Sequence, residues 1–301
     1  MPELKDVGAS VRQRLLNLAH ARGEDFQYVL THYAIERLVV RIVEAGFEDR
    51  FVLKGAALFS IWSEDPYRAT KDLDLLGSGD PSVAAMIETF QAAARADGGA
   101  DGITFDPGSV NATEIRSEAR YPGIRIGVRG SLSGAEVGVQ VDVGFGDVVR
   151  PAVEQVVYPA MLDMPTPGVR CYPPESVIAE KYEAMIRLSV ANSRLKDYFD
   201  VWALSERFAF TAGGLVDAVT ATFERRGTPV PTTRPIALAA EFAGDVGKMA
   251  MWNAFLGRGR VAMTAPSLAE TADQLAAFLG PTWARGSGYR EWHPGGPWGD
   301  D

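Results

Sequence analysis

The spacing of hydrophobic and polar residues predicts a first half of mixed helices and strands. Residues 8–46 carry apolar positions three and four apart, which predicts two helices. The segment FVLKGAALFSIW, from residue 51, predicts a strand, a glycine turn and a helix. In KDLDLL leucines alternate with aspartates, which predicts a strand with acids on one face. Residues 81–96 favour a helix, and 97–111 a loop rich in glycine and aspartate.

Alternation returns in residues 112–146, where turns at Pro122-Gly123 and Ser133-Gly134 predict an antiparallel meander. Prolines concentrated in 159–174 indicate a connector between domains. Beyond it, helical spacing predicts an αα-hairpin that begins at Pro174 and resumes at KDYFDVWAL, then further helices at 213–226, 235–257 and 266–279. We therefore expect an α+β domain with a mixed β-sheet and flanking helices over 1–165, and a mostly helical domain with a flexible tail over 166–301.

Composition narrows the function classes. The chain has 301 residues, with 30 Lys and Arg against 39 Asp and Glu, a net charge of −9. This balance argues against broad binding to phosphate backbones and leaves room for a local basic patch. A single cysteine and three scattered histidines offer neither a disulfide nor zinc-ligand spacing. The charged N-terminus and the absence of an apolar run of about 18 to 20 residues predict a cytoplasmic protein with no membrane segment.

The first candidate for chemistry combines Gly55 with Asp72 and Asp74. Two carboxylates at i and i+2 of a strand project together and repel each other unless a cation lies between them; oxygen ligands favour Mg²⁺ or Mn²⁺. A glycine between a strand and a helix lets backbone N–H groups approach a phosphate. Either feature alone suits an exposed strand face or an ordinary turn. Together they predict a site for a metal ion and a triphosphate.

A third acid, Asp142, interrupts the apolar strand VGVQVDVGFGD. On a strand beside Asp72 and Asp74 it could complete a two-metal site, and its alternative is a hydrogen-bonded acid at a sheet edge. Lys54 precedes the glycine turn and is either a phosphate contact or an exposed lysine.

Upstream of Asp72, Arg68 could steady a phosphate. Thr70 either faces the same site as Asp72 or only fills the strand. A phosphate on Thr70 would repel the triphosphate, so this hydroxyl is also a candidate point of inhibition.

Five segments, taken in order, resemble the motifs of the AbiEii/AbiGii nucleotidyltransferase toxins, within the DNA polymerase β-like superfamily. They are GEDFQYVLTHYAIERLVVRI, FVLKGAALFSIW, YRATKDLDLLG, VQVDVGFGD and AEKYEAMIRLSVANSRLKDYFDVWAL, and the likeness covers residues 10–205. It implies a bilobed protein, an NTP donor with Mg²⁺, and a toxin of a toxin–antitoxin or abortive-infection system with a cognate antitoxin protein. Mycobacterial relatives add nucleotides to the 3′ end of tRNA.

The resemblance also assigns residues. Lys181 matches the lysine of the third motif and would reach the β- or γ-phosphate across the cleft; composition alone favours a solvated lysine. Asp197 and Asp200 match the fourth motif and share a helix face. One could orient Lys181 or Arg187, or bind the acceptor hydroxyl. Ala56 departs from the superfamily, where Gly or Ser follows the glycine, so backbone N–H groups would carry more of the phosphate contact.

The sequence therefore predicts a Mg²⁺-dependent (or Mn²⁺-dependent) nucleotidyltransferase toxin, which releases pyrophosphate and modifies an RNA acceptor, by family likeness the tRNA 3′ end. Two alternatives stay open. One is a toxin that binds NTP and acts through protein contacts without transfer. The other transfers the nucleotide to a protein side chain, and the net charge of −9 counts towards both.

Overall fold

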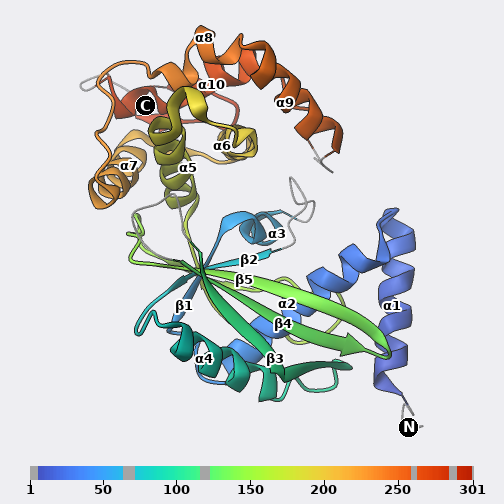
Figure 1. The fold of residues 1–301 in the computed structure, drawn as a ribbon. Helices are drawn as coiled ribbons and strands as arrows, with labels where there is room; N and C mark the ends of the chain where they lie inside the picture. The colour runs from blue at the N-terminus through green and yellow to red at the C-terminus, as the bar shows by residue number, and fades with distance from the viewer. Residues whose placement is uncertain (1–5, 64–71, 116–122, 259–262, 285–289, 300–301) are drawn as a thin grey trace. The chain divides into compact units, whose positions relative to one another are not determined.

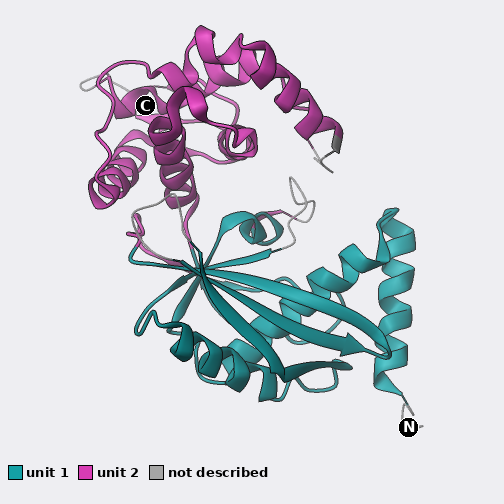
Figure 2. Cartoon of the chain, viewed as in Figure 1, with its two compact units in different colours: residues 1–61, 70–146, 155–171 teal, residues 62–69, 147–154, 172–301 magenta. Residues whose placement is uncertain are grey.

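The computed structural model describes residues 6–63, 72–115, 123–258, 263–284 and 290–299. The chain forms two compact units (Figure 2). Unit 1 comprises residues 1–61, 70–146 and 155–171, and unit 2 comprises 62–69, 147–154 and 172–301. The sequence placed one boundary at 165, whereas in the structure the chain passes between the units several times.

Unit 1 is built on a seven-stranded mixed sheet in the order β3-β4-β5-β2-β1-β7-β6 (Figure 1). Its strands β3, β4 and β5 form the predicted antiparallel meander, β2 runs parallel to β5, and β1 runs antiparallel to β2 and parallel to β7. The strand bounds are Phe51–Lys54 for β1, Asp72–Gly77 for β2, Ile103–Ile115 for β3, Gly123–Leu132 for β4, Ala135–Phe145 for β5, Glu154–Val157 for β6 and Gly168–Cys171 for β7.

Helices cover one face of this sheet. The predicted N-terminal pair is α1 (Val7–Arg22) and α2 (Phe26–Glu44), and the third long helix is α4 (Val83–Arg95). Helix α2 packs against β5 and α4 against β3, so their apolar sides bury the alternate leucines and valines of the strands. A short 3₁₀ turn, Gly55–Ala57, and helix α3 (Leu58–Trp62) follow β1, as the glycine-turn pattern predicts.

Two stretches expected to be loops contain strands. Residues 103–111 belong to β3, which keeps pairing with β4 across an irregularity between Asp106 and Asn111, where Pro107 and Gly108 break the alternation. The proline-rich connector contains β7, whose Cys171 pairs with Leu53 of β1. Both strands are held by partners far away in the chain, which local spacing does not reveal.

Unit 2 is mostly helical. Its helices are α5 (Pro174–Leu188), α6 (Leu195–Arg207), α7 (Ala212–Arg226), α8 (Ala240–Ala243), α9 (Val246–Arg258) and α10 (Leu268–Leu279). Residues of the tail that were expected to be flexible form β9 (Glu291–Trp292) and β10 (Trp298–Gly299), which join β8 (Phe210–Thr211) in a small sheet. Buried Trp292 packs on Phe278 there, with ring centroids 5.0 Å apart. Of the helices that the structure describes, none is both long and apolar enough to cross a membrane.

Candidate active site

A row of four charged side chains crosses the centre of the unit 1 sheet. In the register of the sheet, Lys54 of β1 lies opposite Asp74 of β2, and Asp74 lies opposite Asp142 of β5. Asp142 in turn lies opposite Arg125 of β4. Residues that lie directly opposite each other on neighbouring strands share a face. Two cations therefore flank two carboxylates, and Asp72, two residues before Asp74, adds a third carboxylate to the same face. We call these five residues the carboxylate row.

The alternation of β2 places the acids on the face opposite the helices. Leu73 and Leu75 are 0% and 4% exposed, whereas Asp72 and Asp74 are half-buried. The neighbouring strand repeats the pattern, with Val141 and Val143 buried on either side of Asp142. Burial of the leucines and valines against α2 and α4 thus fixes the direction in which the carboxylates point.

Gly55 lies against the carboxylate of Asp74. Its φ is +71°, a conformation that favours glycine, and a Cβ built there would lie 2.0 Å from Oδ2 of Asp74. Any other residue would have to displace this carboxylate. The next residue, Ala56, is buried in the 3₁₀ turn, and α3 is only five residues long. A phosphate at this turn would therefore depend on backbone N–H groups more than on a helix terminus.

This close approach gives a first prediction. Replacing Gly55 with alanine is expected to weaken Mn²⁺ binding by about tenfold or more, because the added methyl group moves Asp74. Mn²⁺ binding followed by electron paramagnetic resonance measures the effect. The matched control is Gly79→Ala, since Gly79 also has a positive φ but its Cβ would meet nothing within 4 Å. Equal losses in both variants would show that backbone strain alone, and not contact with Asp74, is responsible.

Asp142 is bound by Arg125 in a two-pronged ion pair. Nε of Arg125 donates to Oδ1 at 2.8 Å and Nη2 donates to Oδ2 at 2.7 Å. The hydrogen bond to Asp142 raises the pKa of Arg125, and the negative charges of Asp142, Asp72 and Asp74 act in the same direction. The guanidinium therefore lies in the field of all three carboxylates. Sequence reasoning missed Arg125.

The signal for Arg125 was nevertheless present in the sequence. Ser133 and Gly134, with φ of 46° and 79°, form the two-residue turn between β4 and β5. Such a turn fixes the register of the hairpin, and Arg125 and Asp142 each lie eight residues from it. Counting outward from the turn would have paired them.

Two of the three predicted metal ligands fit a divalent cation. Asp72 and Asp74 present carboxylates on one face, which suits Mg²⁺ or Mn²⁺. Asp142 fits less well, because a cation there would share both carboxylate oxygens with the guanidinium of Arg125, whose positive charge would repel it. In the described part of the chain, no three His, Cys, Asp or Glu side chains lie close enough together to hold a metal ion.

The predicted lysine of unit 2 forms a buried ion cluster. Nζ of Lys181, on α5, donates to Asp197 at 2.9 Å and to Asp200 at 2.7 Å, both on α6. The two aspartate side chains are 1% and 0% exposed, and Arg194 also donates to Asp197 at 2.7 Å. We call these four residues the lysine cluster. Arg187, the other predicted partner, instead pairs with Glu183 at 3.2 Å.

The lysine cluster predicts an acid-sensitive unit 2. Burial alone would raise the pKa of Asp197, but the charges of Lys181 and Arg194 overcome this and lower it below the ordinary value of 3.8. The resulting stability is complete above the unfolded-state pKa and is lost as the pH falls through the lower folded-state pKa. We expect Asp197→Asn to reduce the fall in melting temperature below pH 4, measured by circular dichroism. A fall as steep as that of the unaltered protein would contradict this account.

The two remaining predicted residues, Arg68 and Thr70, lie outside the described residues, and their roles stay predictions. Asp147, which follows the end of β5, accepts a hydrogen bond from Arg226 of α7 at 3.0 Å. Both residues belong to unit 2, and the pair connects its 147–154 segment to α7.

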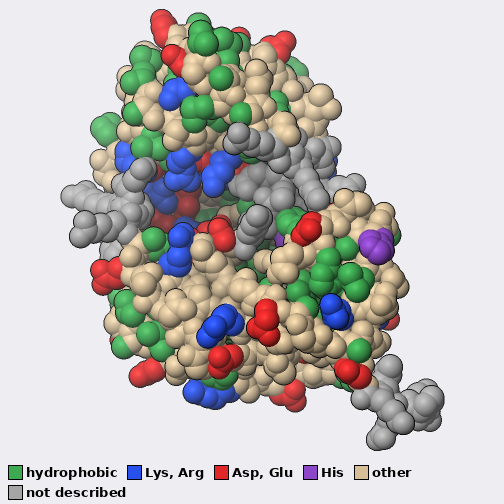
Figure 3. All heavy atoms as spheres, turned by 45° about the vertical axis from the view of Figure 1, so that its right-hand side comes forward, with side chains coloured by type: hydrophobic (Ala, Val, Ile, Leu, Met, Phe, Trp, Pro, Cys, Tyr) green, Lys and Arg blue, Asp and Glu red, His purple; other side chains and the backbone are tan. Residues whose placement is uncertain are grey.

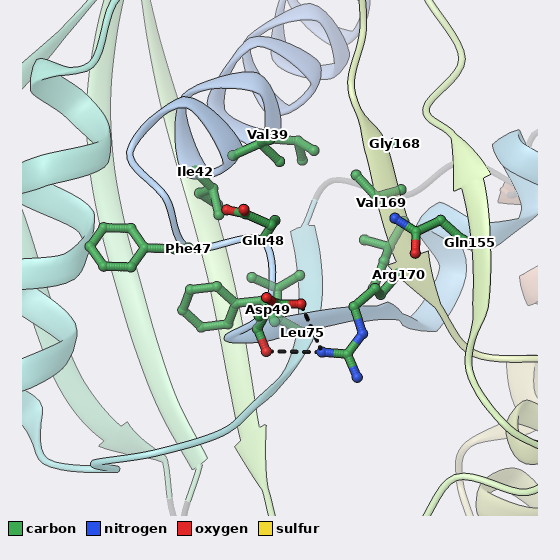
Figure 4. Close-up of a pocket in the computed structure, with 13 residues that line it drawn as sticks. Val39, Ile42, Phe47, Glu48, Asp49, Leu75, Gln155, Gly168, Val169 and Arg170 are labelled. Carbon is green, nitrogen blue, oxygen red and sulfur yellow. Dashed lines mark hydrogen bonds and ion pairs between the residues drawn. The ribbon is translucent and has the colours of Figure 1, made fainter.

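A separate cavity lies on the helix-covered face of the unit 1 sheet (Figure 4). Val39 and Ile42 of α2 line it together with Leu75 of β2, and Arg170 closes one side by donating to the backbone carbonyl of Asp49 at 2.9 Å. Leu75 follows Asp74 in the strand and so points to the opposite face. This cavity is therefore not part of the carboxylate row.

A mixed sheet that carries paired aspartates beside a strand–glycine turn suits a nucleotidyltransferase. The chain belongs to the family described as the nucleotidyl transferase AbiEii toxin of Type IV toxin–antitoxin systems, whose model matches residues 37–275. Membership in this family implies an NTP substrate and an antitoxin partner. The family match extends beyond residue 205, where the resemblance of motifs ended.

Two solved structures from Helicobacter pylori share the fold. One is JHP933, at 16% identity and a TM-score of 0.50, covering 85% of this chain and 92% of its own. The other is a candidate nucleotidyltransferase, also at 16% identity and a TM-score of 0.50, covering 85% of this chain and 95% of its own. A comparison with curated proteins gives no match.

Proposed function

We propose that this toxin transfers a nucleoside monophosphate from NTP to an acceptor hydroxyl in the cytoplasm. The observation that carries the proposal is the contact of Gly55 with Asp74 beside Asp72, because a turn suited to binding phosphate then lies against a pair of carboxylates suited to binding a metal ion. The acceptor hydroxyl gives its proton to a carboxylate oxygen or to solvent as its oxygen forms a bond to the α-phosphorus; the bond between the α-phosphorus and the bridging oxygen breaks, and pyrophosphate leaves.

Asp72 and Asp74 would hold the divalent cation, Mg²⁺ or Mn²⁺. When bound, the cation neutralises the charge that develops on the phosphates. Backbone N–H groups of residues 55 and 56 bind the triphosphate, and Lys54 adds a positive charge at the same row. The acceptor hydroxyl donates a hydrogen bond to an oxygen of Asp142, since each carboxylate oxygen has a second lone pair beyond the one used by Arg125.

For Lys181 we keep the predicted role toward the β- or γ-phosphate as part of the proposal. Its two buried aspartates fix its position, as a lysine that contacts a phosphate requires. Asp197 and Asp200 are then positioning residues, both acting through Lys181, which accounts for two acids on one helix face.

The acceptor we propose is RNA, specifically the 3′ end of tRNA, whose modification would block translation. The resemblance to tRNA-modifying toxins supports this choice. The net charge of −9 counts against a large RNA footprint, and in Figure 3 basic and acidic side chains lie intermixed on the face shown. A short contact limited to the end of the acceptor is compatible with both observations.

Labelled substrates test the acceptor. The protein is incubated with each of the four α-³²P-labelled NTPs, total RNA and a protein extract, and the labelled products are sized. We expect label in a tRNA-sized RNA that ribonuclease removes. Label in a protein band would instead favour nucleotidylation of a protein. Absence of label in both fractions, with NTP bound, would favour a toxin that acts through protein contacts.

A further inference from the structure

The ion pair between Arg125 and Asp142 changes what the third carboxylate can do. Both oxygens of Asp142 accept from one guanidinium, at 2.8 and 2.7 Å. Such two-pronged pairs are the strongest and most oriented contacts between side-chain ions. A metal ion at Asp142 would have to compete with a cation that the fold itself places there, because β4 and β5 hold the two residues directly opposite each other.

The charges of the carboxylate row lead to the same point. Three carboxylates are accompanied by two fixed cations, Lys54 and Arg125, at the two ends of the row. The guanidinium lies at Asp142, whereas Asp72 and Asp74 lie two residues apart on one face of β2, where one divalent cation can bind both carboxylates. A second divalent cation would have to bind at Asp142, whose charge is already neutralised by Arg125.

We infer that Arg125 takes the place at Asp142 that a second divalent cation would occupy, so that this site binds a single divalent cation, at Asp72 and Asp74. The inference rests on the proposed function and adds Arg125 to its machinery. It also removes Asp142 from the predicted metal ligands: Asp142 holds Arg125 in place and keeps its proposed contact with the acceptor hydroxyl.

The guanidinium can replace the electrostatic role of a metal ion. Its charge is permanent, and its side chain is 45% exposed on the carboxylate face. Within the described residues, its Nη1 group has no partner, so its N–H groups can donate to a phosphate oxygen of the substrate. Asp142 fixes the plane of the Arg125 guanidinium group, and the remaining N–H donors of that group face the substrate.

Mn²⁺ binding to the protein without nucleotide, measured by electron paramagnetic resonance, tests the inference. We expect one Mn²⁺ per chain. Asp72→Asn should weaken its binding by about tenfold or more, since a ligand is lost, whereas Asp142→Asn should leave it within about threefold. Circular dichroism melting confirms that each variant is folded. If Asp142→Asn weakens Mn²⁺ binding as much as Asp72→Asn does, Asp142 is a metal ligand and the inference is wrong.

The converse variant removes the guanidinium. Arg125→Ala exposes the Asp142 carboxylate, and we expect a second Mn²⁺ to bind, which the double variant Arg125→Ala/Asp142→Asn should abolish. The matched control is Arg129→Ala, which removes the same charge from the same face and strand but from a residue opposite Gly138. Two Mn²⁺ ions in the unaltered protein, or one in Arg125→Ala, would overturn the inference.

These outcomes separate the inference from the proposed function. If Asp72→Asn leaves Mn²⁺ binding unchanged, the metal site of the proposed function is itself wrong. If Asp72→Asn weakens Mn²⁺ binding as expected but the Asp142 and Arg125 variants do not give their expected results, the inference fails. The nucleotidyltransferase proposal then stands, with two cations taking part in it.

Discussion

Replacing Asp74 with asparagine is expected to lower nucleotidyl transfer by at least about a thousandfold while leaving unit 1 folded. The loss follows because charge stabilisation by a metal ion is worth several kcal/mol, and each 1.4 kcal/mol is a factor of ten. The carboxylate is half-buried on the open face and packs no core, so the melting temperature should not fall.

Transfer of α-³²P to RNA measures the activity, and circular dichroism measures the melting temperature. The control is Asp106→Asn on β3, an exposed acid in the same sheet that is not part of the carboxylate row. A folded Asp74→Asn protein that transfers nucleotide at the unaltered rate would show that these carboxylates do not hold a catalytic metal.

Replacing Lys181 with methionine should destabilise unit 2 by about 3 to 5 kcal/mol, because Asp197 and Asp200 would stay buried without their shared cation. This corresponds to a fall in melting temperature of roughly 6 to 20 °C. The substitution keeps the aliphatic stem and removes the charge.

The triple variant Lys181→Met/Asp197→Asn/Asp200→Asn separates charge from packing. It should recover part of the lost stability, since the uncompensated charges are removed as well. If Lys181→Met melts at the unaltered temperature, the ion cluster does not stabilise the α5–α6 pair. Transfer by Lys181→Met should then be compared below its own melting temperature, so that a loss of activity reports on phosphate binding rather than on unfolding.

The sequence predicted the parts of the site that depend on local alternation. Leu73 and Leu75 had to be buried, so Asp72 and Asp74 had to share the other face, and the glycine after β1 had to mark the turn. The structure confirms this arrangement and adds the contact between Gly55 and Asp74, which depends on how β1 and β2 pair.

The parts that sequence reasoning missed depend on distant partners. Strand β7 is four residues long and pairs with β1, more than a hundred residues earlier, so no local pattern marks it. The tail strands β9 and β10 are two residues each and exist because Trp292 is buried against Phe278. Lys181 looked solvated from composition, and only the packing of α5 on α6 shows its two buried acids.

The position of the label in the donor tests the central claim most directly. The protein is given the same NTP labelled with ³²P either at the α- or at the γ-phosphate, with RNA as acceptor and with Asp74→Asn as the inactive control. The account predicts that the α label enters RNA and that the γ label is released as pyrophosphate, in both cases only with Asp74 intact. Entry of the γ label into any acceptor, or transfer by Asp74→Asn, would contradict it.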